Sequence, residues 1–440
     1  MTNRTTTRRR VTAALVATAL AAPAAAVTTA VTTASATAVT ASSVGATAPA
    51  QADLRRVAEE RLRTRLEAVT EAGAVGAVGY SRGARGRAWS GAAGVRTIDG
   101  AQPARAGDTA RVASVTKAMV ATLAMQEVDR GRWTLDTSVG DVLPGLLPGH
   151  DEVTLEQLLS HRSGLPDHIQ AILAGAGDTK EFLAAINRDR TDRQLVAAAL
   201  TQPWLFEPGT DFSYSNTNYV VVGLMLQRAA KRSIRALLEQ RVFSPARMTS
   251  ARFPTTGPAF AGPRHITDYA IVERPYNLDE HSSTIFSPAG AVVASARDIS
   301  SFYRALFAGR LVSRASLTRM LEPRTPEAGY GLGIYLAGDP CPGPDGEPQL
   351  LYGHDGAAFG TVTFVFSSAD GTRQASVAFG GRQYVDQPPT VTAANDFLVD
   401  AFTSTCPRSV PETARERSTR DLGTLSRNLD QAASEALGVG

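Results

Sequence analysis

Apolar residues recur at helical spacing near the start of the patterned part of the chain. The segment 52–70 is charged and carries them at near-helical intervals: Leu54, Val57, Leu62, Leu66 and Val69. Two short apolar runs follow, AVGAVGYS and RAWSGAAGV, and glycine-rich turn residues separate them as in a β-hairpin. A long helix is predicted after Ser114, where KAMVATLAMQEVDRG runs to Gly131.

The pattern is helical in the middle of the chain and alternating near its end. Between about 150 and 284 the periodic segments are TLEQLLSH, EFLAAIN, DRQLVAAAL, NYVVVGLMLQRAAK and IRALLEQRVF. From about 351, TVTFVFSSADGTRQASVAFGG predicts two strands around the turn Asp370-Gly371, and ANDFLVDAFTS predicts a last helix. These elements predict an α/β fold of the α+β kind: a central antiparallel sheet built from both termini, flanked by helices, with an inserted, mostly helical subdomain.

Composition divides the chain into three parts. Residues 1–52 read as an export signal followed by a Thr/Ala/Val-rich leader, and residues 407–440 as a polar, flexible and dispensable tail. Residues 53–406 form the expected domain, with a sheet lobe at about 53–135 and 285–406 and a helical lobe at about 136–284.

The N-terminal segment predicts a secreted protein without a stable membrane anchor. Four arginines precede VTAALVATALAAPAAA, a run too short and too rich in alanine to span a bilayer securely. Small-residue cleavage patterns occur at 24–26 and at 50–52, and both remain open. The sequence TRRRVTA matches a twin-arginine signal only in part.

Charge and metal-ligand patterns exclude several function classes. The net charge of +3 becomes −1 without residues 1–50, and no basic block follows, so no nucleic-acid partner is expected. The six histidines include no His-x-x-x-His pair, so no metal or other cofactor is expected. In an exported chain Cys341 and Cys406 favour one disulfide over two buried thiols.

Lysine is rare in this chain, which draws attention to Lys117. Of 45 basic residues only Lys117, Lys180 and Lys231 are lysines, and Lys117 alone follows a serine, Ser114, by three positions. Arginine cannot lose its proton in a protein, whereas a desolvated lysine can act as a base. Residues three apart share a helical face, so Lys117 can take the hydroxyl proton of Ser114 during attack on a carbonyl. The alternative interpretation is that Lys117 is an ordinary exposed lysine on a helix.

A second serine signal competes with Ser114. Residues 79–83, Gly-Tyr-Ser-Arg-Gly, fit the nucleophile elbow of α/β-hydrolases, which needs a strand, a sharp turn and then a helix. The glycine-rich segment after Ser81 predicts a strand instead of a helix, so we interpret Ser81 as a hairpin residue.

Longer segments carry a resemblance to a known family. ASVTKAMV, TLEQLLSHRSGLPDH, PGTDFSYSNTNYVVVGLM and SPAGAVVASARDISSFYRALF resemble the penicillin-recognising serine hydrolases, above all secreted D-alanyl-D-alanine carboxypeptidases and class C β-lactamases. The elements Ser-x-x-Lys, Tyr-x-Asn and His-x-Gly occur in that order, and the likeness extends from about residue 54 to residue 406. It implies a β-lactamase/transpeptidase-like fold.

The resemblance implies a role for each motif residue. Ser114 is the acylated nucleophile, Lys117 its proton partner, and Tyr214 a proton relay whose pKa a nearby cation must lower. Substrate binding falls to four residues: Asn216, His354, Asp355 and Gly356. The oxyanion hole consists of the N–H groups of Ser114 and Ala357. His161 and Ser163 are expected to be scaffold residues.

Two departures from the family pattern bear on the substrate. Asp355 stands where the carboxypeptidase relatives have a hydroxyl residue that helps to bind the terminal carboxylate, and YGLGIYLAGDP (330–340) holds no arginine. A carboxylate repels an anionic substrate but pairs with an ammonium group. The leading prediction is nevertheless a D-alanyl-D-alanine carboxypeptidase-type peptidase on cell-wall peptides. An esterase, a D-aminopeptidase and a β-lactamase are the alternatives, and a non-catalytic binder of cell-wall peptide is the rival from another class. We expect a monomer acting on small peptide, ester or β-lactam substrates.

Overall fold

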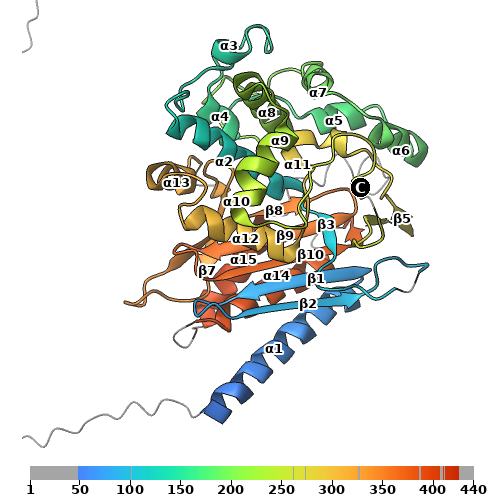
Figure 1. Cartoon of the computed structure of the whole chain (residues 1–440). Helices are drawn as coiled ribbons and strands as arrows, with labels where there is room; N and C mark the ends of the chain where they lie inside the picture. Colours follow the sequence, from blue (N-terminus) through green and yellow to red (C-terminus); the bar gives the residue numbers. More distant parts are fainter. Residues whose placement is uncertain are drawn as a thin grey trace, which may run out of the picture. The chain divides into compact units, whose positions relative to one another are not determined.

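The main sheet joins the two ends of the patterned chain (Figure 1). The computed structural model describes residues 48–425 except 101, 261, 273, 326–327, 386–387, 407–409 and 411. The six strands of the sheet are β1 (Gly76–Arg82), β2 (Ala88–Gly94), β7 (Tyr335–Asp339), β8 (Gln349–Ala357), β9 (Thr361–Ser368) and β10 (Gln374–Gly380). Their order is β2-β1-β10-β9-β8-β7, and every neighbouring pair is antiparallel. The N-terminal hairpin therefore pairs directly with the C-terminal strands, which confirms the predicted fold class.

Both predicted hairpins are present in the sheet. β1 and β2 pair with Ser81 opposite Trp89, so no helix follows Ser81 and the nucleophile-elbow alternative is excluded. β9 and β10 join around Asp370 and Gly371, and Gly371 has a φ of 67°, a conformation that glycine adopts without steric cost.

The helices are more numerous than the strands. In chain order they are α1 (Ala48–Glu71), α2 (Thr116–Asp129), α3 (Val139–Val142), α4 (Leu155–Leu159), α5 (His168–Leu173), α6 (Thr179–Asn187), α7 (Asp192–Ala199), α8 (Asn216–Ala230), α9 (Ile234–Leu238), α10 (Ser244–Ala246), α11 (Ser287–Gly290), α12 (Ala296–Phe307), α13 (Arg314–Leu321), α14 (Pro389–Thr403) and α15 (Glu412–Leu425). Short turns of 3-10 or π helix accompany them, at Ala113–Val115, Glu239–Phe243 and Ser283–Ile285. All five helical segments predicted between residues 150 and 284 are confirmed.

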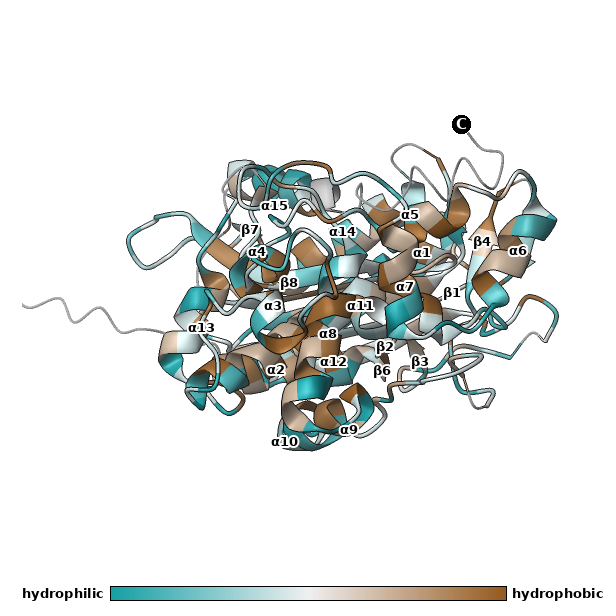
Figure 2. Ribbon diagram, turned by 90° about the horizontal axis from the view of Figure 1, so that it is seen from above, coloured by the Kyte–Doolittle hydropathy of each residue, from teal (hydrophilic) through white to brown (hydrophobic). Residues whose placement is uncertain are grey.

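Each face of the sheet packs against its own set of helices. Phe364 and Phe366 of β9 point into one core, together with apolar residues of α1 and α14. Val365, between them in sequence, points into the other core with residues of α2, α8 and α12, as the two-residue period of a strand requires. Figure 2 shows the largely hydrophobic α8, which belongs to this second core, near the middle of the view.

Two small sheets complete the fold. β3 (Thr109–Arg111) pairs with β6 (Val293–Ser295), and β4 (Tyr269–Ile271) lies between β5 (Pro275–Asn277) and β11 (Arg382–Gln383). The β3–β6 pair matters for the site because β3 leads directly into the turn that carries Ser114.

The C-terminal segment differs from the prediction of a flexible tail. Residues 412–425 form α15, whose Leu422 is fully buried and whose Arg415 pairs with the buried carboxylate of Asp400 at 2.7 Å. Asp421 accepts a hydrogen bond from Gly338 N in the edge strand β7 at 2.9 Å. A polar composition concealed this helix, because its few apolar residues pack against a sheet edge that local sequence does not reveal. The export signal and most of the leader lie outside the described residues, as do residues 426–440.

A disulfide joins Cys341 to Cys406, as the sequence favours. It connects the segment after β7 with the segment after α14, two parts of the chain that are 65 residues apart. Within the described residues no helix is long and apolar enough to cross a membrane.

Candidate active site

Ser114 lies in a strained turn between a strand and a helix. β3 ends at Arg111, and Ala113 then adopts a φ of 46°, which is unfavourable for a residue with a Cβ. Ser114 follows within the 3-10 turn Ala113–Val115, and α2 begins at Thr116. Such strain at a non-glycine residue persists only where the surrounding structure enforces it, and it clusters at functional sites. The turn places Ser114 at the N-terminal end of α2, where unpaired N–H groups favour a developing negative charge.

Lys117 points directly at Ser114. Its Nζ lies 3.0 Å from Ser114 Oγ, 2.7 Å from Asn216 Oδ1 and 3.0 Å from the carbonyl oxygen of Ala289. A neutral amine has two N–H bonds and one lone pair. Because the amide oxygen and the carbonyl oxygen can only accept, they take both N–H bonds, and the lone pair is left facing the serine hydroxyl. This geometry suits a base that removes the proton of Ser114.

Burial makes that neutral form accessible. The side chain of Lys117 is fully buried, and the resulting desolvation lowers its pKa from 10.5 to about 7, although the carboxylates of Asp167 and Asp355 act in the opposite direction. At pH 7 about half of the Lys117 side chains are therefore neutral. Ser114 and Lys117, both predicted from the sequence, thus have the geometry and the protonation states that proton transfer between them needs.

Tyr214 also contacts the nucleophile, but its pKa differs from the prediction. Its side chain hydrogen bonds with Ser114, and Lys117 Nζ lies 4.9 Å from the centre of its ring. From the sequence we expect a nearby cation to lower the pKa of this phenol. Burial instead raises the pKa of Tyr214 well above 10, and the carboxylate of Asp355 adds to the effect. Tyr214 is thus a neutral proton donor at physiological pH.

Asn216 has its amide engaged by the protein at both ends. Its oxygen accepts from Lys117, while its Nδ2 and its backbone N each donate to Asp167 Oδ2 at 2.7 Å. The motif predicts that Asn216 binds the substrate. In the structure it first of all connects Lys117 to a buried carboxylate, and one Nδ2 hydrogen is left for another acceptor.

His161 and Ser163 support the site from behind, as expected of scaffold residues. The ring of His161 stacks on that of Tyr214 with 4.1 Å between centroids, and its Nδ1 accepts from Ser215 N at 3.2 Å. Burial and the Lys117 charge lower the pKa of His161 well below 6.5, so the ring is neutral. Ser163 Oγ donates to Asn218 Oδ1 at 2.6 Å in the first turn of α8.

The end of β8 borders the turn of Ser114. β7 pairs with β8 only as far as Gly353, so among the described residues no strand pairs with 354–357 on that side. A Cβ on Gly356 would lie 2.3 Å from Val112 O and 3.1 Å from Ser114 N. Only glycine allows the strand to approach the nucleophile this closely. Ala357, whose N–H is predicted to belong to the oxyanion hole, follows Gly356 as the last residue of β8.

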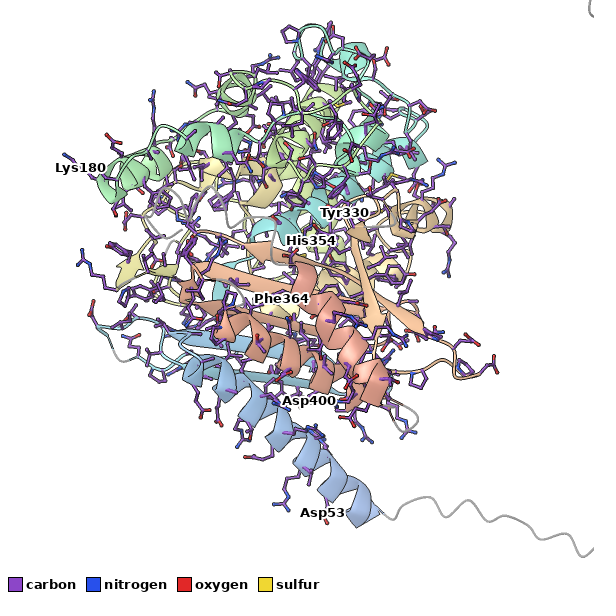
Figure 3. The ribbon with its side chains drawn as sticks, turned by 180° about the vertical axis from the view of Figure 1, so that it is seen from behind. Asp53, Lys180, Tyr330, His354, Phe364 and Asp400 are labelled. Atoms are coloured by element: carbon purple, nitrogen blue, oxygen red, sulfur yellow. A yellow bond between two sulfur atoms is a disulfide. The ribbon has the colours of Figure 1, made fainter. Side chains whose placement is uncertain are left out.

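His354 and Asp355, both predicted to bind the substrate, differ in their exposure. His354 is wholly buried, so it does not face a substrate as predicted, and its Nε2 is 3.2 Å from the hydroxyl of Tyr330 (Figure 3). Asp355 keeps a side-chain exposure of 10%, and His354 Nδ1 lies 3.3 Å from its carboxylate. Among the described residues no arginine or lysine forms an ion pair with Asp355, which leaves its charge to act on the site.

Two residues of the site were not predicted from the sequence. Asp167 caps α5 through a bond from Ile169 N, and Tyr330 packs edge-on against Tyr214. The sequence signal for Asp167 is an Asp between Pro166 and the apolar helix HIQAIL, which is typical of a helix cap and conceals the second contact to α8. Tyr330 lies in a loop more than a hundred residues from Tyr214, and no local pattern marks it.

These features together define the class of protein. A serine in the turn before a helix, a lysine three residues later, a Tyr-x-Asn segment and a strand edge beside the serine form the site of a penicillin-recognising serine hydrolase. Within the described residues no group of His, Cys, Asp or Glu side chains could hold a metal ion.

Comparison with known proteins agrees with this class. The family model described as Beta-lactamase matches residues 14–377, and the chain belongs to that family. The structure of a D-stereospecific amidohydrolase from Streptomyces sp. is similar, with a TM-score of 0.64 and 30% identity, covering 74% of this chain and 94% of that one. The esterase EstB of Burkholderia gladioli is 31% identical over 188 residues, which is 40% of this chain and 46% of the esterase.

Penicillin-binding protein 4* of Bacillus subtilis (strain 168) is 27% identical over 290 residues, which is 61% of this chain and 60% of that protein. The matches to three relatives named as penicillin-binding proteins cover 53%, 60% and 67% of their lengths. The chain therefore has the β-lactamase fold and spans between about half and two thirds of the length of these relatives.

Proposed function

We propose that the protein is an exported amidohydrolase that acylates Ser114 and then hydrolyses the acyl-enzyme. The observation that carries this proposal is the 3.0 Å contact between Lys117 Nζ and Ser114 Oγ, made by a buried lysine whose pKa is about 7. A non-catalytic binder has no use for such a base, which argues against that rival. Export is inferred from the arginines and apolar run of residues 4–26.

Acylation begins when Lys117 accepts the hydroxyl proton as Ser114 Oγ bonds to the substrate carbonyl carbon. The carbonyl oxygen becomes an oxyanion, and the N–H groups of Ser114 and Ala357 are proposed to bind it. The C–N bond then breaks while Tyr214 donates its proton to the departing amine, and the Lys117 ammonium returns a proton to Tyr214. Because its pKa is raised, Tyr214 is protonated at neutral pH and still holds the proton that the departing amine needs.

Deacylation runs the same proton transfers in reverse. Water adds to the ester carbonyl and loses one proton to the Tyr214–Lys117 pair. The bond from carbon to Ser114 Oγ then breaks, the serine recovers a proton, and the carboxylic acid leaves. The two steps together consume one water molecule and leave every residue of the site in its starting state.

The substrate class that we favour is an amide of an amino acid with a free ammonium group. Asp355 lies on the strand that borders the nucleophile and raises the pKa of Lys117 through its charge, so it acts within the site. Its carboxylate attracts an ammonium and repels a carboxylate. The similarity to a D-stereospecific amidohydrolase supports an amide of the D configuration.

A D-alanyl-D-alanine carboxypeptidase is the second candidate, and one observation favours it. Arg382 Nη1 donates to the carbonyl oxygen of Ala358 at 2.6 Å, and Arg382 lines a cavity together with Ala357. An arginine beside the end of β8 is a suitable partner for a terminal carboxylate. The relatives named as penicillin-binding proteins support this second candidate, and EstB supports ester hydrolysis as a third activity of the same site.

The test compares substrates that differ in their termini and in their configuration. D-phenylalanine p-nitroanilide, its N-acetyl derivative, its L enantiomer and an N-acyl-D-Ala-D-Ala peptide are each assayed with the wild type and with Ser114→Ala. We expect hydrolysis of the free D-amine substrate above all, and none by the variant. Preference for the N-acyl dipeptide would replace the first candidate with the second, and Arg382→Ala would then abolish that preference. Wild-type rates in Ser114→Ala would refute both.

A further inference from the structure

A buried carboxylate, Asp167, connects two helix N-termini beside the catalytic lysine. It is 8% exposed, and its Oδ1 accepts from Ile169 N at 2.7 Å in the first turn of α5. Its Oδ2 accepts from the backbone N and the Nδ2 of Asn216, the first residue of α8, both at 2.7 Å. Capping of α5 needs only the first of these contacts, so the double contact to Asn216 calls for another explanation.

We propose that Asp167 is a positioning residue, whose carboxylate turns the side chain of Asn216 so that its amide oxygen faces Lys117. A carboxylate can only accept hydrogen bonds, so it binds the NH2 end of the Asn216 amide and directs the oxygen end away. The oxygen then accepts from Lys117 Nζ at 2.7 Å. With an amide in place of the carboxylate, an NH2 group can face Asn216, and the orientation of the Asn216 amide is no longer fixed.

The orientation of this amide decides where the Lys117 lone pair points. The oxygens of Asn216 and Ala289 take the two N–H bonds of the neutral amine, and the lone pair faces Ser114. If the Asn216 amide turned over, its NH2 would donate to the amine and occupy that lone pair. The inference rests on the proposed function, since it concerns the residue that deprotonates Ser114.

Asp167 also acts on Lys117 through its charge. Its carboxylate raises the pKa of Lys117, so its neutralisation lowers that pKa further below 10.5. The other titratable groups that face or act on Lys117 are His161, His168 of α5, Tyr214, Tyr219 of α8 and Asp355 of β8. Burial keeps both histidines and both tyrosines neutral near pH 7, and the charge of Asp355 is unchanged when only Asp167 is altered.

The experiment measures modification of Ser114 by a fluorophosphonate at pH 5 to 9 in the wild type, Asp167→Asn and Asp178→Asn. In this reaction Oγ bonds to phosphorus, fluoride leaves, and Lys117 takes the hydroxyl proton. Asp178 caps α6 through a bond from Glu181 N and has no contact with the site, so Asp178→Asn is the matched control. Peptide mapping identifies the modified serine, and thermal unfolding shows that each variant is folded.

For Asp167→Asn we expect a labelling rate at high pH that is at least about tenfold lower, because the lone pair of Lys117 is no longer directed. We also expect the acid side of the profile to move to lower pH, while Asp178→Asn behaves as the wild type. A wild-type rate and profile in Asp167→Asn would overturn the inference, as would a lower rate with an unmoved profile, which indicates a structural role alone.

Failure of the proposed function gives a different result, since the wild type itself would then not be labelled on Ser114. If Asp167→Asn does not fold, Asp167→Glu replaces it, because it keeps the charge and displaces the carboxylate by one methylene. For Asp167→Glu, a lower labelling rate at high pH supports the inference if the acid side of the pH profile stays where it is in the wild type. A wild-type labelling rate overturns the inference.

Discussion

Replacement of Lys117 by arginine keeps the positive charge and removes the base. The neutral fraction of Lys117 follows from its pKa of about 7: about one half at pH 7, about nine tenths at pH 8 and about one tenth at pH 6. The activity of the wild type should therefore fall about fivefold from pH 7 to pH 6, about tenfold for each further pH unit below 6, and reach a plateau above pH 8. Activity falls toward acid pH because the active form of Lys117 is the deprotonated one, and this form is lost as the pH falls. Arginine stays protonated throughout this range.

For Lys117→Arg we expect at least about a thousandfold lower kcat/KM at pH 8, the scale of general-base catalysis. The assay is hydrolysis of a chromogenic ester at pH 5 to 9, beside Lys180→Arg, the same exchange at an exposed residue of α6. Because Lys117 is fully buried, the larger side chain also costs about 1–3 kcal/mol of stability, which thermal unfolding measures. A folded Lys117→Arg with wild-type activity, or a flat wild-type profile, would refute the role of Lys117.

Three further changes address other parts of the account. Tyr214→Phe removes the proton donor, so kcat for an amide should fall about a hundredfold and kcat for an activated ester much less, because a nitrophenolate leaves without a proton; equal losses on both substrates would contradict this role. Asp355→Asn should raise KM at least about tenfold for a free-amine amide and leave KM for its N-acetyl derivative unchanged, since only the first carries an ammonium; parallel changes in the two KM values would exclude Asp355 as the ammonium partner. Cys341→Ser with Cys406→Ser opens a cross-link between residues 65 apart, which should cost about 4 kcal/mol of unfolding free energy while activity at 25 °C is kept; an unchanged denaturation midpoint would show that the disulfide contributes nothing to stability.

The sequence predicts the architecture well because local pattern and global fold agree in this chain. Alternation in β9 and β10 and helical periodicity in α2, α7 and α8 are carried by residues that all point to one core or the other. The pairing of the N-terminal hairpin with the C-terminal strands follows from the order of the elements. α15 escapes prediction because it is stabilised by ion pairs and by one buried leucine, Leu422, against distant partners.

The active site is predictable only in part. Ser114, Lys117 and Tyr214 are close in sequence to recognisable motifs, and the structure brings the three together. The pKa of Tyr214 could not be foreseen, because its direction depends on how deeply the ring is buried. Asp167 likewise reads as an ordinary helix cap, and its contact with Asn216 depends on where α8 begins in space.

Mass spectrometry of the acyl-enzyme shows directly whether Ser114 is the residue that is acylated. The mature protein is mixed with benzylpenicillin or a chromogenic ester, quenched in acid within the time of one turnover, and digested with trypsin, which releases the peptide Val112–Lys117. We expect the mass of this peptide to increase by that of the acyl group, with the modification on Ser114. We expect no adduct in Ser114→Ala. An adduct on another residue, or unimpaired substrate turnover by Ser114→Ala, would contradict this expectation.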